Sequence, residues 1–132
     1  MLPLQHPKTW LVLGWALVAL SLWVCLVPTN TAVLVPLFEL NDKFMHMFGY
    51  VVLMLWFAGI YPRSRFRWIA LGLFAMGAGV EVLQELMSVG RSGDVYDAVA
   101  DTLGIAIGYF SAVRWLGGWV QRLETFLLAL KS

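Results

Sequence analysis

The chain has 132 residues and a formal net charge of +1, with 61% hydrophobic and only 13% charged residues. Soluble domains average about 45–50% apolar and about 25% charged residues, so this composition excludes an ordinary soluble domain and predicts an integral membrane protein. The near-neutral charge gives no reason to expect a nucleic-acid partner. The single cysteine, Cys25, excludes a disulfide framework within the chain and a Cys-based zinc motif.

The first apolar run covers residues 10–27, carries no charge and ends before Pro28, a residue that a helix interior tolerates poorly. It is longer than a usual signal-peptide core, and no A-x-A cleavage pattern follows it. We therefore expect a retained transmembrane helix. The apolar connection over residues 28–41 is expected to lie at the membrane interface.

Three further membrane helices are expected, over residues 43–61, 68–87 and 95–115. Asp94 is a suitable N-cap for the last of them. Residues 116–131 form the C-terminal tail, in which Trp119, Leu123 and Leu127 belong to an apolar stripe at helical spacing. This pattern indicates an amphipathic helix in the membrane interface, although an extension of the fourth helix past the bilayer is an open alternative. The predicted fold is thus a single all-α domain over residues 1–132, an integral membrane four-helix bundle with a C-terminal interfacial amphipathic helix.

The basic residues predict the orientation of this bundle. With four spans, the side that holds both termini carries seven of the nine basic residues: Lys8, Arg63, Arg65, Arg67, Arg114, Arg122 and Lys131. Only Lys43 and Arg91 fall on the other side. Because basic residues concentrate in cytoplasmic loops, we predict that both termini are cytoplasmic.

Seven of the eight acids then share the outer face with His46: Glu39, Asp42, Glu81, Glu85, Asp94, Asp97 and Asp101. Ionisable residues inside a membrane are costly and mark a functional site or a paired network. On the fourth helix, four small residues recur at every fourth position: Ala100, Gly104, Gly108 and Ala112. This spacing predicts a seam where another helix approaches closely.

The outer polar residues are spaced as stripes on three helices. Asp42 and His46 are four residues apart, as are Glu81 and Glu85, and Asp97 and Asp101. Side chains at this spacing lie above one another on a helix. We therefore expect the three stripes to turn inward and face one another rather than lipid.

Individual residues in these stripes have more than one interpretation. Arg91 is the strongest candidate for an anion contact through its planar guanidinium, or it neutralises a nearby acid. Glu81 is suited to proton transfer, or it is a hydrogen-bonded structural carboxyl. The sequence contains no compact motif such as H-E-x-x-H and no nucleotide-binding loop. We therefore assign no metal, no cofactor and no catalytic residue, and keep a carboxylate–histidine metal site as a minority alternative.

These residues resemble the VanZ-like family of small bacterial membrane proteins. The family pattern appears as Asp42, Lys43, His46 and Tyr50, then Glu81 and Gln84, then Gly90-Arg91, and finally Asp97 through Gly104. The family has Asn where this chain has Asp101, a departure that adds a charge at that position. The resemblance implies a location in the bacterial cytoplasmic membrane. It also implies a link to teicoplanin susceptibility, since the family is named for a protein associated with low-level teicoplanin resistance.

The predicted site contains Asp42, Lys43, His46, Tyr50, Glu81, Gln84, Arg91, Asp97 and Asp101. Our leading hypothesis is that this site binds an envelope lipid or a cell-wall-linked group at the outer leaflet. A membrane-embedded lipid hydrolase or transferase is a second hypothesis, and a structural network in an assembly partner is a third. Ion transport is disfavoured, because the inner halves of the helices are apolar. The sequence does not predict an oligomeric state.

Overall fold

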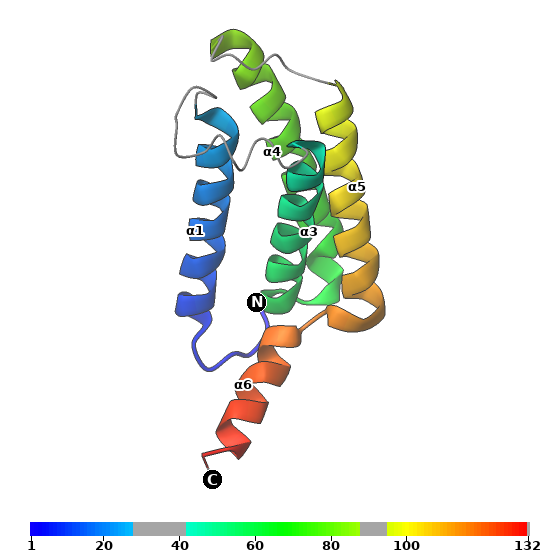
Figure 1. Cartoon of the computed structure of the whole chain (residues 1–132). Coiled ribbons are helices and arrows are strands. Elements are labelled where there is room, and N and C mark those ends of the chain that lie inside the picture. Colours follow the sequence, from blue (N-terminus) through cyan, green and yellow to red (C-terminus); the bar gives the residue numbers. More distant parts are fainter. Residues whose placement is uncertain (28–41, 88–94, 132) are drawn as a thin grey trace.

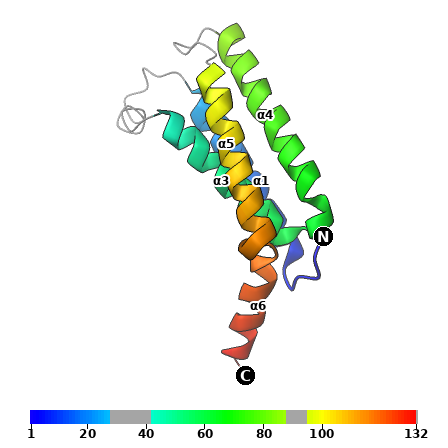
Figure 2. The ribbon, with the colours of Figure 1, turned by 90° about the vertical axis from the view of Figure 1, so that its right-hand side faces the viewer.

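A computed structural model describes residues 1–27, 42–87 and 95–131 of the chain. These residues form helices and turns, without a strand, which confirms the all-α prediction. In chain order the elements are α1 (Pro7–Leu26), α3 (Asp42–Ile60), the 3-10 turn η1 (Arg63–Arg65), α4 (Phe66–Met87), α5 (Val95–Ser111), the π-helical turn η2 (Ala112–Leu116) and α6 (Trp119–Ala129). The helices α1, α3, α4 and α5 run alongside one another, and α6 extends beyond one end of them (Figures 1 and 2).

Three segments among the described residues are long and apolar enough to cross a membrane: Pro7–Leu26, Lys43–Ile60 and Arg63–Met87. Their outward faces expose large apolar side chains such as Trp15 and Phe74, an arrangement suited to contact with lipid. The helix α5 has 17 residues and runs on into η2. The chain is therefore a membrane protein with helices of spanning length, whereas the crossing by α5, and so the four-span topology, remains a prediction.

Two helix ends differ from the predicted ranges for local reasons. The helix α1 begins at Pro7, before the predicted start at residue 10, with proline in its first turn; the fixed φ of proline suits that position. The α-helical part of α5 ends at Ser111, and the turn η2 follows. Gly118 then adopts a φ of 69°, which glycine reaches without steric cost, and this conformation redirects the chain into α6.

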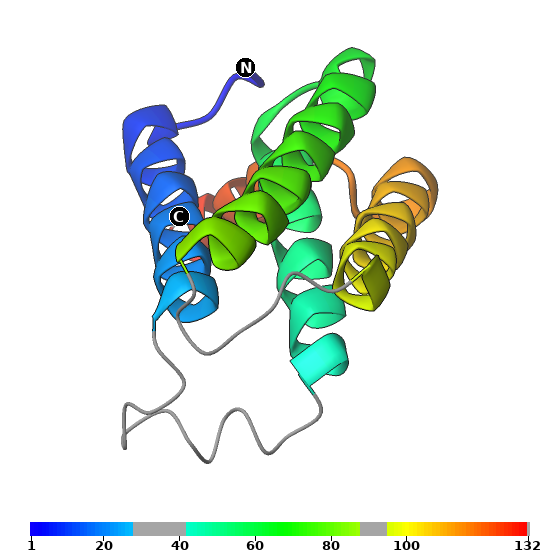
Figure 3. The same cartoon turned by 90° about the horizontal axis from the view of Figure 1, so that it is seen from above.

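The predicted small-residue seam on α5 is confirmed, and its partner is α3. A Cβ atom added to Gly104 would collide with the Met47 carbonyl oxygen, and one added to Gly108 would lie 2.7 Å from Met54 Cβ. The two backbones are therefore close enough that only glycine fits. This contact sets the register of α3 against α5. The two helices lie next to each other in the view from above (Figure 3).

At the end that holds both termini, α6 is tied to the start of the chain. Glu124 accepts hydrogen bonds from the backbone N–H of Gln5 at 2.6 Å, the backbone N–H of His6 at 3.1 Å and Trp10 Nε1 at 2.8 Å. Beside it, the rings of Trp10, Trp56 and Trp119 have pairwise centroid distances of 5.6 Å. The first turns of α6 are thereby fixed to the helices of the bundle.

Further along α6, the predicted apolar stripe is exposed rather than packed: Phe126, Leu127 and Leu130 all lie at the surface. The helix points away from the bundle in both side views (Figures 1 and 2). Its location in the membrane interface remains a prediction.

Candidate functional site

Described residues from the predicted polar stripes of three helices meet in the folded protein, near the end of the bundle opposite both termini. The helices α3 and α5 begin at this end, while α4 ends there. The first turns of α3 and α5 and the last turns of α4 therefore bring their polar residues to one level. We call this region the polar end. It contains Lys43 and His46 from α3, Glu81 and Gln84 from α4, and Asp97 and Asp101 from α5.

The most buried contact at the polar end joins His46 and Asp101. His46 Nδ1 lies 2.9 Å from Asp101 Oδ1, and the residues are only 6% and 2% exposed. The pair is a hydrogen bond when the imidazole is neutral with Nδ1 protonated, and an ion pair when the imidazole is protonated. A buried carboxylate is costly without a partner. The contact with His46 therefore explains how the chain accommodates an aspartate at position 101, where the family has asparagine.

Glu81 joins this pair from α4. Each of the three residues His46, Glu81 and Asp101 has one nitrogen or oxygen atom that could bind a metal. These three atoms all lie within 4.8 Å of one another. We refer to these three residues as the acid–histidine cluster. Each comes from a different helix, so the cluster exists only in the folded protein.

Gly77 allows α4 to approach the cluster, a role that we did not predict. A Cβ atom at this position would lie 2.9 Å from Asp101 Oδ2 and 3.1 Å from the Tyr50 hydroxyl oxygen. Tyr50 is itself buried and belongs to the apolar core. The spacing carries a signal, because Gly77 precedes Glu81 by one helical turn and so lies on the same face of α4.

A second ion pair lies at the surface of the polar end. Lys43 Nζ is 3.5 Å from Asp97 Oδ1, and the lysine side chain is 48% exposed whereas that of the aspartate is 8% exposed. The ammonium also lies 5.9 Å from the centre of the Tyr96 ring. A buried carboxylate and an aromatic ring thus hold a cation where molecules outside the protein can reach it.

Gln84 makes a contact between helices that the sequence did not predict. Its Nε2 donates a 2.8 Å hydrogen bond to the backbone carbonyl oxygen of Cys25, one of the last carbonyls of α1. Such carbonyls have no partner within their own helix, so Gln84 fastens the end of α1 to α4. Cys25 therefore contributes its backbone oxygen to this contact.

Two predicted site residues are not placed by the structure: Arg91 lies outside the described residues, and so does the side chain of Asp42 at the first position of α3. Of the other outer acids, Glu39 and Asp94 also lie outside the described residues. Glu85 is described and is exposed. The anion contact predicted for Arg91 thus stays a prediction from sequence.

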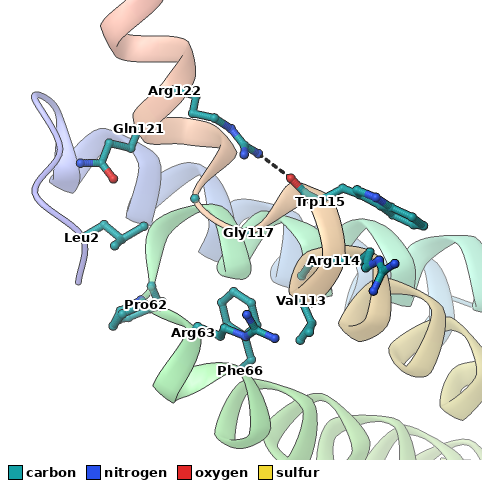
Figure 4. A pocket seen from close by; sticks show the side chains of 13 residues that line it. Leu2, Pro62, Arg63, Phe66, Val113, Arg114, Trp115, Gly117, Gln121 and Arg122 are labelled. Atoms are coloured by element: carbon teal, nitrogen blue, oxygen red, sulfur yellow. Dashed lines mark hydrogen bonds between the residues drawn. The ribbon is translucent and has the colours of Figure 1, made fainter.

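A separate pocket lies at the opposite end, near the termini (Figure 4). It has a volume of about 410 Å³ and is lined by Leu2, Phe66 and Gly117, with three basic residues from η1, η2 and α6. These basic residues are Arg63, Arg114 and Arg122. Arg122 Nη2 donates a 2.9 Å hydrogen bond to the Trp115 carbonyl oxygen. Sequence analysis placed these arginines on one side of the membrane but did not predict a pocket.

The two ends of the bundle therefore differ in chemistry. The polar end combines an imidazole with carboxylates, which can exchange protons, accept hydrogen bonds or bind a cation. The opposite end presents arginine side chains near both termini.

No curated protein and no solved structure shows a significant match to the chain. A family model described as VanZ/LLP1 matches residues 10–116, a range that includes every described residue of the polar end. The chain therefore belongs to the VanZ/LLP1 family, as the resemblance predicted.

Proposed function

We propose that this membrane protein binds the polar headgroup of an envelope lipid, or of a cell-wall-linked lipid, at the polar end. The observation that carries the proposal is the ion pair of Lys43 with Asp97, in which the lysine side chain is half exposed and the aspartate side chain is buried. Basic side chains at a membrane surface bind anionic headgroups. A lysine that a buried carboxylate holds in place needs little reordering to contact a phosphate.

The acid–histidine cluster supports the same function. A lipid headgroup that carries hydroxyl or amide groups beside its phosphate offers donors and acceptors. Of the three residues in the cluster only Glu81 is partly exposed, and its carboxylate offers an acceptor to such a headgroup. Polar groups at fixed positions in an otherwise apolar setting give orientation and specificity to a ligand.

The membrane side of the site follows from the basic residues. The predicted orientation places both termini in the cytoplasm and the polar end at the outer leaflet of the bacterial cytoplasmic membrane. Arg91, as predicted from the sequence, would supply a second cation for the headgroup. Since the family is named for a teicoplanin-resistance protein, the proposal extends to a change in teicoplanin susceptibility when the polar end is disabled.

Native mass spectrometry of the detergent-purified protein tests the proposal. We expect the wild type to retain a lipid adduct and Lys43→Gln to lose it. Lys131→Gln is the matched control, because Lys131 is an exposed lysine far along the chain in the C-terminal tail, and this variant should keep the adduct. Equal adducts in Lys43→Gln and the wild type would overturn the proposal.

A second candidate function is hydrolysis or group transfer on such a lipid. The observation that favours it is the 2.9 Å contact between His46 Nδ1 and Asp101 Oδ1, since a carboxylate that orients an imidazole prepares it for acid–base chemistry. Turnover of a labelled lipid that disappears in Glu81→Gln would support this function. Turnover that is unchanged in this variant would exclude a role for Glu81 in it.

A further inference from the structure

The acid–histidine cluster has the donor set of a metal centre. It combines one imidazole and two carboxylates, with the three ligand-type atoms within 4.8 Å of one another. We propose that His46, Glu81 and Asp101 bind a divalent first-row transition-metal ion. This inference goes beyond headgroup binding and does not depend on it. It favours the metal site that the sequence left as a minority alternative, because the three ligands do not form a compact motif in the chain.

An unsatisfied atom of Asp101 points to a missing ligand. Asp101 is 2% exposed, and its Oδ2 accepts no hydrogen bond from any described residue. This oxygen faces Gly77 on α4, the same helix that carries Glu81 one turn further on. Buried polar atoms are nearly always satisfied in folded proteins, so a ligand that Oδ2 can contact completes the site.

The charge of the cluster favours a cation. Two carboxylates and one imidazole lie together in a bundle of membrane helices, where ionisable groups are costly and mark a functional site or a paired network. A divalent ion neutralises both carboxylates at once and leaves the imidazole neutral, as metal ligation requires. Mixed imidazole and carboxylate donors suit ions such as Zn²⁺ and Mn²⁺.

The geometry needs only a small closure. Ligand atoms around one tetrahedral ion at bond lengths near 2.0–2.2 Å lie about 3.4 Å apart, compared with at most 4.8 Å in the cluster. Gly77 leaves no side chain between α4 and Asp101, so α4 already lies close to this carboxylate. Since the ligands come from α3, α4 and α5, the bound ion would also tie these helices together.

Metal binding to the full chain tests the proposal. The protein is purified in detergent without a polyhistidine tag, stripped with a chelator, dialysed against Zn²⁺ or Mn²⁺ and analysed for bound metal by mass spectrometry. We expect one ion per wild-type chain and an affinity lower by about 100-fold or more in His46→Gln and Asp101→Asn. The matched controls are His6→Gln, which removes an exposed imidazole, and Glu85→Gln, which removes an exposed carboxylate from α4. Both should bind like the wild type.

Two further measurements keep the outcome decisive. If a ligand variant fails to fold, the electron spin-echo spectrum of Mn²⁺ bound to His6→Gln still reports imidazole nitrogen coordination by His46. A wild type that binds neither ion, or an equal loss of affinity in Glu85→Gln and Asp101→Asn, would overturn the proposal. The lipid adduct is measured in parallel on wild-type protein that the chelator has stripped of metal. An adduct without metal binding overturns only the metal site, and metal binding without an adduct overturns only the proposed lipid function.

Discussion

His46 Nδ1 and Asp101 Oδ1 lie 2.9 Å apart although their residues are separated by 55 positions in the chain. The contact crosses from α3 to α5 directly above the glycine seam that joins these two helices. Because both side chains are buried, each limits the cost of burying the other. The pair therefore contributes to the stability of the helix contact as well as to the chemistry of the polar end.

A double-mutant cycle on this pair should reveal strong coupling. His46→Ala or Asp101→Ala leaves a buried polar partner, so each should lower the free energy of unfolding by about 3–5 kcal/mol. The double variant should lose less than the sum, with a coupling energy of about 1–3 kcal/mol. Unfolding of the metal-stripped proteins in detergent, followed by circular dichroism, measures all four states. Additive losses would show that the two side chains do not interact in the folded protein.

The glycine seam predicts opposite results at two helical glycines. Gly104→Ala should destabilise the protein by about 1–3 kcal/mol, because the added Cβ would collide with the Met47 carbonyl oxygen. Gly79→Ala is the control, since among the described residues no atom beyond the adjoining helix backbone lies within 4 Å of a Cβ added there. This control should be neutral or stabilising, given the higher helix propensity of alanine. Thermal unfolding compares the two, and equal stability would contradict the close contact of α3 with α5.

The sequence predicts those features of the site that follow from helical spacing. His46, Glu81 and Asp101 could be expected to share a level because they occupy polar stripes on three helices. Gly104 and Gly108 could be expected to form a seam because their spacing repeats that of a helix face. Such inferences need only the helix period and the cost of exposing polar groups to lipid.

Other features depend on the relative placement of the helices and were missed. The Cys25 carbonyl oxygen that receives Gln84 Nε2 is a backbone atom, so no residue type marks it as a partner. The sequence predicted no partner for Glu124, whereas this residue joins α6 to the start of the chain. Its partners lie 119, 118 and 114 residues away, a separation at which one sequence gives no pairing signal.

The contact between Gln84 and the end of α1 should control local opening there. In Gln84→Met the side chain keeps its approximate volume but loses the donor to the Cys25 carbonyl oxygen. We expect faster hydrogen exchange at the last amides of α1 and a loss of about 1 kcal/mol in stability. Leu83→Met is the control, because Leu83 is on the exposed side of α4. Unchanged exchange in Gln84→Met would show that α1 is held by apolar packing alone.

The bonds to Glu124 predict a pH dependence of stability at the opposite end. Burial alone would raise the pKa of Glu124, but hydrogen bonds from the Gln5 backbone, the Trp10 indole and the His6 backbone lower this pKa below its ordinary value of 4.5. A carboxyl whose pKa is lower in the folded than in the unfolded state stabilises the protein above the unfolded-state pKa. That stabilisation is lost as the pH falls through the folded-state pKa.

Replacing this carboxylate should therefore matter at neutral pH and cease to matter in acid. At pH 7, Glu124→Gln should melt at a lower temperature than the wild type, because an amide accepts fewer hydrogen bonds and carries no charge. The difference should shrink as the pH falls below 4.5 and vanish once the wild-type carboxyl is protonated. Thermal unfolding across this pH range measures the difference, with Thr125→Ala, at the neighbouring exposed residue, as the control. A difference in melting temperature between wild type and Glu124→Gln that stays constant with pH would contradict this prediction. It would mean that the amide destabilises the protein for steric reasons and that the charge of Glu124 does not hold α6 to the start of the chain.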